Sequence, residues 1–272
     1  MAEGGRPDVS VIIVSWNTCD VLRRCLRALS DSRCVCAFEV IVVDNASLDG
    51  SARMVEQEFA GVRLLKNDRN AGHAVANNQG MRAARGRYLL LLNSDALVLE
   101  DCMQRMYAFL EEYRDIAVVS AQSVYEDMQV QQSCRRQIRP DTLLFDDTCL
   151  GWWLPHNRPM NRYRYRDWDH CSMRAVEQAP LTCLMLRSRV LDLVGMFDPG
   201  YFLYFCDSDY CARLRQKRLS VIFLPQARVV HLESVSIKGY AAAAITWHAG
   251  RLRFFCKHYG GFWLPVIKAI WC

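Results

Sequence analysis

The 272-residue sequence lacks both glycine-rich motifs that commonly hold phosphate groups in α/β proteins. Its first strand-like segment, VSVIIVSW, runs into Asn17 without a G-x-G-x-x-G turn or a G-x-x-x-x-G-K-[ST] loop. A dinucleotide-binding fold and a P-loop protein are therefore not indicated. If the protein binds a phosphate ligand, the phosphate must be held in a different way.

The sequence also lacks the strong basic excess that is typical of nucleic-acid binding. Its 34 Lys and Arg residues and 29 Asp and Glu residues give a formal charge of only +5. The basic residues form no stripe interleaved with stacking aromatics, so we expect no nucleic-acid partner. The small surplus suits an anionic ligand or an acidic membrane face.

Signals for secretion and for a disulfide framework are absent as well. The polar start MAEGGRPD is not followed by a long apolar segment, so no signal peptide is predicted. The 13 cysteines include no C-x-x-C pair, and the nearest couples are Cys34 with Cys36 and Cys206 with Cys211. We interpret them as reduced thiols of a cytoplasmic protein.

The first half of the chain alternates β-branched runs with amphipathic helical patterns. This alternation is typical of βα units on a mostly parallel sheet flanked by helices, which is an α/β fold. We expect strands at residues 9–15, 39–43, 62–66, 88–92 and 117–121, and helices at 21–29, 51–59, 74–84 and 101–113.

The pattern changes in the second half. Residues 122–178 are Arg-rich and aromatic, and we expect an insertion of loops and short strands there, with Trp152 and Trp153 facing the acceptor. Regular structure is expected to resume with a strand at 181–186, a helix at 189–194 and a strand at 220–224. A final helical region is expected to begin near Tyr240.

Polar residues follow several of the expected strands. Ligands of open α/β sheets bind beyond the carboxyl ends of the strands, which points to Trp16–Asn17, Asp44–Asn45 and Asn93–Asp95. A carboxylate such as Asp95 can hold a divalent cation against a diphosphate. The same Asn-Ser-Asp sequence also fits an ordinary turn.

Two further groups of candidate residues lie downstream. Asp207 and Asp209 begin an expected helix, where a carboxylate either caps the helix or serves as a general base. His231 follows the strand-like ARVV and is either a metal ligand or a structural residue.

Five blocks in order, spread over about residues 8–258, resemble glycosyltransferase family 2, and within it the bacterial rhamnosyltransferases of cell-surface polysaccharide synthesis. The blocks are VSVIIVSWN, IVVDNASLDGS, NDRNAGHAVANNQGMRAARGRYLLLLNSDALV, VGMFDPGYFLYFCDSDYCARLRQK and LPQARVVHLESVS. The resemblance implies a GT-A fold over residues 1–239, with a nucleotide-sugar part at about 8–122 and an acceptor part at about 123–239. Residues 240–272 would form a C-terminal helical segment.

The resemblance also assigns roles to residues. It implies that Asp207 is the catalytic base and that Asp95 and His231 hold a divalent metal, Mg²⁺ or Mn²⁺. Asp44 would recognise the pyrimidine base. The other implied donor-side residues are Asn17, Asn70, Gly72, Asn77, Asn78 and Ser94, and the implied acceptor-side residues are Trp152, Trp153, Cys206 and Asp209.

The sequence departs from the family pattern at three places. Asn93 replaces the first aspartate of the metal-binding D-x-D motif, and Cys206 stands where a glutamate is usual. Leu181-Thr182-Cys183 replaces a small Gly-Ala step. The first two changes dilute the acidic site, which leaves a catalytically weak or inactive glycan-binding scaffold as the alternative to an enzyme. A nucleotidyltransferase would require the glycine-rich phosphate loop that is missing.

The activity implied by the resemblance is an inverting transfer of a sugar, L-rhamnose above all. The donor would be a dTDP- or UDP-sugar, and the acceptor a hydroxyl of a polysaccharide or a polyprenyl-linked glycan. The C-terminal segment either contacts the inner face of the cytoplasmic membrane peripherally or packs on the domain's core. Its bulky apolar and basic residues are Trp247, Arg251, Phe254, Phe255, Lys257 and His258.

Overall fold

The computed structural model of the chain describes residues 5–143, 145, 149–154, 156–232, 243–260 and 265. The strands are β1 Val9–Ser15, β2 Phe38–Asp44, β3 Val62–Lys66, β4 Tyr88–Asn93, β5 Ala96–Val98, β6 Val118–Val124, β7 Arg174–Val176, β8 Cys183–Arg187 and β9 Val221–His231. The helices are α1 Cys19–Ser30, α2 Ser51–Glu58, α3 His73–Ala83, α4 Cys102–Glu112, α5 Pro140–Leu143, α6 Cys149–Trp153, α7 Arg158–Tyr163, α8 Val190–Val194, α9 Cys206–Gln216 and α10 Ala243–Tyr259.

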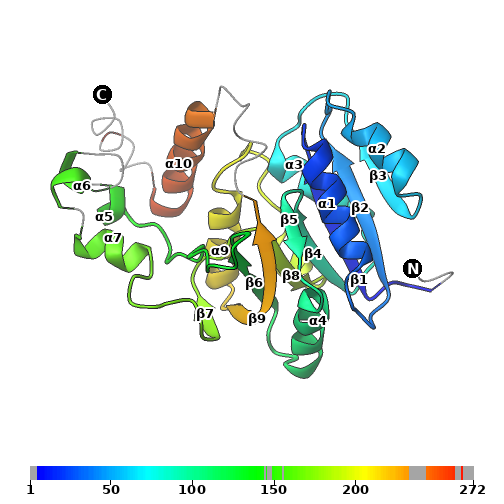
Figure 1. Ribbon diagram of the computed structural model, residues 1–272. Coiled ribbons are helices and arrows are strands. Elements are labelled where there is room, and N and C mark those ends of the chain that lie inside the picture. Colours follow the sequence, from blue (N-terminus) through cyan, green and yellow to red (C-terminus); the bar gives the residue numbers. More distant parts are fainter. Residues whose placement is uncertain are drawn as a thin grey trace.

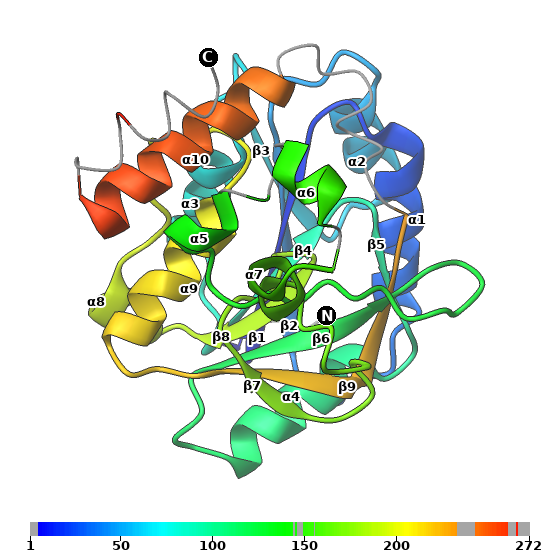
Figure 2. The same cartoon turned by 90° about the vertical axis from the view of Figure 1, so that its left-hand side faces the viewer.

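The described strands form one nine-stranded sheet with the order β3-β2-β1-β4-β8-β6-β9-β5, and β7 pairs with β9. Strands β3, β2, β1, β4, β6 and β9 run in one direction, whereas β8, β5 and β7 run in the opposite direction. Helices cover the sheet on both sides (Figures 1 and 2). The predicted mostly parallel α/β fold is confirmed.

Alternation along β1 separates the two hydrophobic cores. Val11 and Ile13 belong to the core that contains residues of α1 and α4, whereas Ile12 belongs to the core that contains residues of α3, α9 and α10. Successive side chains of a strand point to opposite faces, so a strand buried on both faces must be apolar throughout. The sequence of β1, VSVIIVS, is apolar except for two serines, so it nearly meets this requirement.

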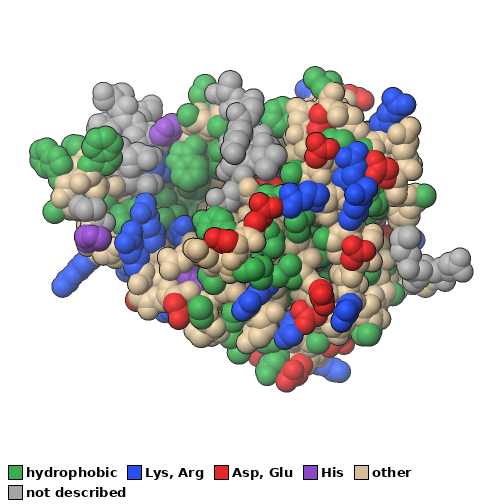
Figure 3. Space-filling view, viewed as in Figure 1, with side chains coloured by type: hydrophobic (Ala, Val, Ile, Leu, Met, Phe, Trp, Pro, Cys, Tyr) green, Lys and Arg blue, Asp and Glu red, His purple; other side chains and the backbone are tan. Residues whose placement is uncertain are grey.

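The insertion between β6 and β8 differs from the expectation of loops and short strands. It contains the short strand β7 but also the three helices α5, α6 and α7, each of four to six residues. A helix of less than two turns is too short to show a periodic spacing of apolar residues, so these three helices were not predicted from the sequence. Hydrophobic side chains project at the position of α6 (Figure 3), and Trp152 and Trp153 are 89% and 79% exposed.

Strand β9 continues well past its predicted end at residue 224. Ala121 of β6 pairs with Leu224, but the next residue, Gln122, pairs with Arg228. The residues between Leu224 and Arg228 therefore bulge from the ladder at Pro225, which cannot donate a backbone hydrogen bond. Beyond this bulge the strand resumes and carries His231 to the sheet edge beside β5.

Helix α10 packs two of its aromatic residues inward. Phe254 and Phe255 have no exposed surface and join the core that includes residues of α9. The predicted start of this helix near Tyr240 lies outside the described residues, as do residues 261–264 and 266–272. In the described part of the chain, no helix has the length and apolarity needed to cross a bilayer. The packing of these two rings favours the core alternative for this part of the segment.

Charged residues at the end of α10 surround a buried carboxylate of α9. Asp209 has no exposed surface, and it accepts contacts at 2.8–2.9 Å from Arg213, Lys257 and His258. Burial opposes ionisation, but these three hydrogen bonds outweigh it and hold the pKa of Asp209 below its ordinary value. Asp209 is thus the centre of an ion cluster that joins α9 to α10.

We expect Asp209→Ala to destabilise the fold by about 3–5 kcal/mol, because the largely buried Arg213 loses its carboxylate partner. Since the folded-state pKa of Asp209 is depressed, its contribution is complete above the ordinary carboxyl pKa of about 4 and declines as pH falls below it. Urea unfolding followed by circular dichroism at pH 7 measures the change. Asp192→Ala, at an exposed position of α8, is the control. Equal unfolding midpoints for the two variants would contradict the assignment.

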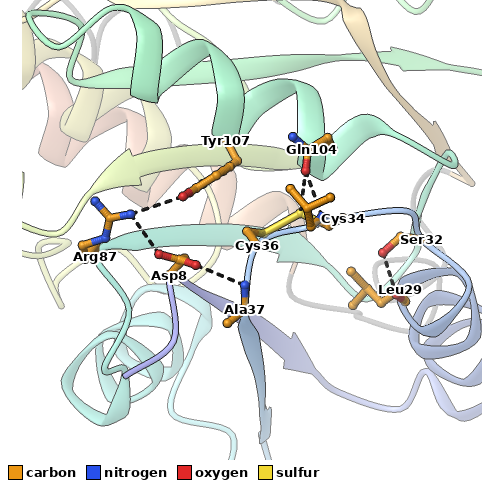
Figure 4. Close-up of a disulfide and its surroundings, with 10 residues drawn as sticks. Asp8, Leu29, Ser32, Cys34, Cys36, Ala37, Arg87, Gln104 and Tyr107 are labelled. Atoms are coloured by element: carbon orange, nitrogen blue, oxygen red, sulfur yellow. Dashed lines mark hydrogen bonds and ion pairs between the residues drawn. A yellow bond between two sulfur atoms is a disulfide. The ribbon is translucent and has the colours of Figure 1, made fainter. Parts of the chain in front are cut away.

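One pair of cysteines corrects the expectation that all are thiols. Cys34 and Cys36, in the loop between α1 and β2, form a disulfide, with their Cα atoms 5.3 Å apart (Figure 4). This separation is within the range that a disulfide spans, so proximity in the loop suffices without a C-x-x-C motif. The other cysteines among the described residues, ten in number, are free.

Candidate active site

A cavity of about 370 Å³ opens where the strand ends meet α9 and α10. Residues that follow β1, β2 and β4 line one side of it, including Trp16, Asn45 and Ser94. The start of α9 and the end of β9 line the other side. Asp95, His231 and Asp207 all line this one cavity, although they are far apart in the sequence.

Asp95 and His231 form the candidate metal-binding pair. Asp95 is 6% exposed, and its Oδ1 lies 3.5 Å from Nε2 of His231. Backbone pairing between β5 and β9 sets this proximity, since Ala96 is opposite His231. On the other side of the ring, Nδ1 of His231 lies 3.2 Å from Oε1 of Gln131, a contact that fixes the ring orientation.

This donor set fits a divalent cation that completes its coordination with ligand oxygens. Carboxylate oxygen and imidazole nitrogen both bind Mn²⁺, and carboxylates bind Mg²⁺. No group of three or more His, Cys, Asp or Glu side chains that could hold a metal occurs among the described residues. Asn93, in the place of the usual first aspartate, lines the cavity and is uncharged. Among the described residues, Asp95 and His231 are therefore the two metal donors at this position.

Asp207 is in the first turn of α9 and faces the same cavity. Burial raises the pKa of its carboxyl, although the backbone N–H and the hydroxyl of Ser208 oppose the shift. The Ser208 N–H donates to Oδ1 at 2.7 Å. A carboxylate with a raised pKa is better matched to proton transfer from an alcohol than an ordinary aspartate.

Cys206 and His73 form a neutral pair beside Asp207. The Sγ of Cys206 lies 3.8 Å from Nδ1 of His73, and both residues line the cavity. Burial raises the pKa of the Cys206 thiol well above its ordinary value and lowers the pKa of His73 to about 4. At the position where the sequence resemblance implies a carboxylate, this protein has an uncharged thiol.

The predicted donor-side residues divide into two groups. Asn70 and Ser94 line the cavity directly. Asp44 is 3% exposed at the end of β2; its Oδ2 accepts a hydrogen bond from the Ser47 N–H, whereas its buried Oδ1 has no partner. An unpaired buried acceptor is costly unless a ligand completes it. Neither Asp44 nor Asn17 lines the cavity; Asn17 is an exposed residue next to the cavity-lining Trp16, and its Oδ1 accepts from the Leu48 N–H.

The other three predicted donor-side residues, Gly72, Asn77 and Asn78, are structural neighbours of the cavity. Gly72 has φ +87°, and a Cβ there would lie 2.7 Å from the carbonyl oxygen of Phe202, so only glycine fits. The amide of Asn78 exchanges hydrogen bonds with the backbone of Phe197. Asn77 donates to the carbonyl of His73. Asn77 and Asn78 do not line the cavity; Asn78 ties α3 to the backbone of Phe197, whereas Asn77 bonds within α3.

Among the predicted acceptor-side residues, Cys206 lines the cavity, whereas Trp152, Trp153 and Asp209 do not. Sequence reasoning missed several residues that do. His73 was part of a block already linked to the donor, and Trp247 was assigned only to the tail. Tyr163 and Gln178 come from the insertion, whose fold could not be predicted.

The chain belongs to glycosyl transferase family 2, whose profile matches residues 10–174, more than half of its length. Among its relatives is the N-acetylglucosaminyl-diphospho-decaprenol L-rhamnosyltransferase of Mycobacterium tuberculosis, 25% identical over 95% of this chain and 87% of the relative. The succinoglycan biosynthesis protein ExoO of Rhizobium meliloti is 37% identical over 37% of this chain and 29% of its own length. The O-antigen biosynthesis protein RfbC of Myxococcus xanthus is 24% identical over 85% of this chain.

The chain spans only 18% of RfbC, so several relatives are much longer proteins. Solved structures share the fold. The mannosyltransferase PcManGT from Pyrobaculum calidifontis, solved with GDP-Man and Mn²⁺, superposes with a TM-score of 0.60 at 20% identity, covering 98% of this chain and 69% of that one. TarS of S. aureus superposes with a TM-score of 0.61 at 17% identity, covering 92% of this chain and 39% of TarS. These likenesses establish the GT-A fold.

Proposed function

We propose that the protein is an inverting glycosyltransferase that moves a sugar from a nucleoside-diphosphate donor to a hydroxyl of a glycan acceptor. One observation carries the proposal: Asp95, His231 and Asp207 line a single cavity at the strand ends. Family membership supports the same class of reaction. In this proposal residues 8–122 hold the donor and residues 123–239 provide the acceptor side.

The nucleoside would bind at the ends of β1 and β2. The unpaired Oδ1 of Asp44 is suited to accept a hydrogen bond from the N–H of a pyrimidine base. Asn70, which is held by Asn45 at 2.8 Å, would approach the donor from the segment before α3. Asn17 keeps the loop that contains Leu48 in place.

The diphosphate would lie beside Asp95 and His231, which would hold Mg²⁺ or Mn²⁺ as a cofactor. A bound divalent cation supplies neutralising charge for the diphosphate leaving group. Asp95 contributes the negative charge of this pair, and Gln131 holds the His231 ring so that Nε2 faces Asp95. Ser94, buried next to Asp95, receives a hydrogen bond from Thr18 at 3.2 Å and stiffens the turn.

Asp207 would remove the proton from the acceptor hydroxyl as that oxygen attacks the anomeric carbon. The new glycosidic bond forms on the face opposite the nucleotide, the bond to the diphosphate oxygen breaks, and the configuration inverts. Partial burial of Asp207 in the cavity raises the pKa of this carboxylate, which favours its role as a proton acceptor. The neutral pair of Cys206 and His73 adds no charge that would compete with it.

For the donor we propose dTDP-L-rhamnose, with UDP-sugars as the second choice, and for the acceptor a polysaccharide or polyprenyl-linked glycan made for the cell surface. The relative from Mycobacterium tuberculosis, named as an L-rhamnosyltransferase, supports this choice. Peripheral contact with the inner face of the cytoplasmic membrane belongs to the same proposal. A thermal-shift panel of nucleotide sugars with and without Mn²⁺ tests the donor, because a ligand that binds the folded state raises Tm.

Product formation separates the enzyme from its alternative, a glycan-binding scaffold on the same fold. The enzyme transfers sugar to an acceptor or hydrolyses the donor slowly in the presence of Mn²⁺. A scaffold does neither, even if the thermal shift shows donor binding. Release of nucleoside diphosphate, measured with the purified chain, therefore decides between the two.

Cys206→Ser is expected to leave kcat/KM within about tenfold of the wild type. Serine keeps a small neutral donor beside His73, and one neutral hydrogen bond contributes only about 0.5–1.5 kcal/mol. The thiol is protonated at neutral pH because burial raises its pKa. Steady-state rates of nucleotide release measure the effect, with Cys171→Ser at an exposed position as the control. A loss beyond about 100-fold would show that sulfur itself takes part.

A further inference from the structure

Three arginines surround a second recess beside the active-site cavity. This recess, of about 350 Å³, is lined by Gln132, Arg135, Arg164 and Arg166. All four residues come from the insertion between β6 and β8, and none comes from the nucleotide-sugar part of the chain. Lys and Arg side chains gather around α7, which directly precedes Arg164 (Figure 3).

None of the described carboxylates lines this recess, so the described residues do not compensate its positive charge within it. Two acids of the insertion are already paired elsewhere. Asp167 contacts Arg136 at 3.1 Å and Arg174 at 3.8 Å, and Glu177 contacts Arg215 at 3.2 Å. Within the part of the chain that the structure describes, the Arg164 and Arg166 guanidinium groups have no ion-pair or hydrogen-bond partner.

Backbone hydrogen bonds orient the Arg135 side chain before any ligand binds. Its Nη1 donates to the carbonyl oxygens of Gln132 and Cys134, which fixes the guanidinium plane. Burial and the neighbouring charge of Arg164 both lower the pKa of Arg135. Side chains of like charge held together without a counter-ion are typical of sites that bind an anion, because the anion relieves their repulsion.

The recess is connected to the active-site cavity through Gln178. The backbones of Arg135 and Gln178 exchange hydrogen bonds of 3.0 Å in both directions. The side chain of Gln178 lines the cavity and donates at 2.8 Å to Ser208, the neighbour of the proposed base Asp207. Tyr163, which precedes Arg164, lines the cavity too. An anion in the recess would therefore lie on the side where the acceptor enters.

We propose that Arg135, Arg164 and Arg166 form a binding site for a phosphate or diphosphate group carried by the acceptor. This inference rests on the proposed glycosyltransferase function for the origin of the ligand. The chemistry rests on the guanidinium groups alone. Arginine matches phosphate oxygens with paired N–H donors, and the volume accommodates a diphosphate. A neutral glycan without phosphate would make no use of the three charges.

The test is calorimetric binding of farnesyl diphosphate in EDTA, with farnesol as the uncharged probe. EDTA removes divalent cations, so binding at Asp95 and His231 does not contribute. We expect the wild type to bind farnesyl diphosphate but not farnesol, and Arg164→Glu/Arg166→Glu to bind it at least about tenfold more weakly. The control Arg53→Glu/Arg114→Glu makes the same change of net charge at two exposed positions. Arg53 lies on α2, and Arg114 lies just after the end of α4.

Inorganic pyrophosphate is the second probe, and it distinguishes a lipid-borne group from a free one. Weaker binding of both diphosphates by the Arg164/Arg166 variant alone supports the anion site, and tighter binding of the farnesyl compound than of pyrophosphate identifies the lipid-borne form. The proposal is overturned if the control variant weakens diphosphate binding as much as Arg164→Glu/Arg166→Glu does, or if neither variant changes the binding. Because this readout needs no turnover, it stands even if the transferase reaction fails. Unchanged transfer to a phosphate-free acceptor by the same variant shows that the catalytic site is intact.

Discussion

Asp207→Asn is expected to lower kcat by about 10²–10⁴-fold, the contribution typical of general-base catalysis. The amide keeps the size of the side chain and can still accept a hydrogen bond from Ser208, so the start of α9 should not change. It cannot take the proton of the acceptor hydroxyl. Donor binding, measured by thermal shift, is expected to remain, because the donor contacts proposed above come from other residues.

The pH profile of the wild type gives independent support. Because the pKa of Asp207 is raised, the acidic limb of kcat/KM should lie above the ordinary carboxyl value of about 4, with activity lost as pH falls through it. Asp127→Asn, in an exposed turn, is the matched control and should match the wild type. Turnover by Asp207→Asn at the control's rate would eliminate Asp207 as the base.

Removal of the metal, or of its carboxylate ligand by Asp95→Asn, should cost about 10²–10³-fold in kcat. The developing charge on the diphosphate would then lose its main electrostatic partner. His231→Ala should cost less, because the imidazole is neutral as a ligand and Asp95 remains. Rates are measured after dialysis against EDTA and again with added Mn²⁺ or Mg²⁺.

Recovery with metal is the informative comparison. The wild type should recover fully, whereas Asp95→Asn should need a much higher Mn²⁺ concentration for half-maximal activity. Asn93→Asp, which restores the usual first aspartate, should lower that concentration. Full activity of the wild type in EDTA would show that the pair formed by Asp95 and His231 serves another purpose.

Much of the fold follows from local patterns. The apolar runs of β1 and β3 were bounded correctly to the residue, since each is a short segment flanked by clear turn signals. The insertion was not predictable, because helices as short as α5 and α6 depend on tertiary contacts rather than on their own periodicity. The continuation of β9 past Pro225 depends on its ladder with β6, which the sequence does not reveal.

The sequence singled out charged residues that the structure places in one cavity, but it did not single out several of the neutral residues that line the same cavity. Asp95, Asp207 and His231 carry chemistry that can be recognised from residue type, and they do share one cavity. His73 and Gln178 could not be identified as site residues from the sequence, because their place in the cavity depends on how neighbouring elements pack in the fold. Asp209 shows the reverse case: this carboxylate, two residues from the proposed base, is fully buried, does not line the cavity and contacts Arg213, Lys257 and His258.

The position of that ion partner has a practical consequence for shortened versions of the chain. Asp207 and Asp209 lie in the same turn of α9, and the groups that neutralise Asp209 include Lys257 and His258. A version that stops before α10 would leave Asp209, next to the proposed base, with its contact to Arg213 but without those to Lys257 and His258. Loss of turnover on trimming the C-terminus would then reflect a misaligned α9, and it should not be taken as evidence for a lost acceptor or membrane contact.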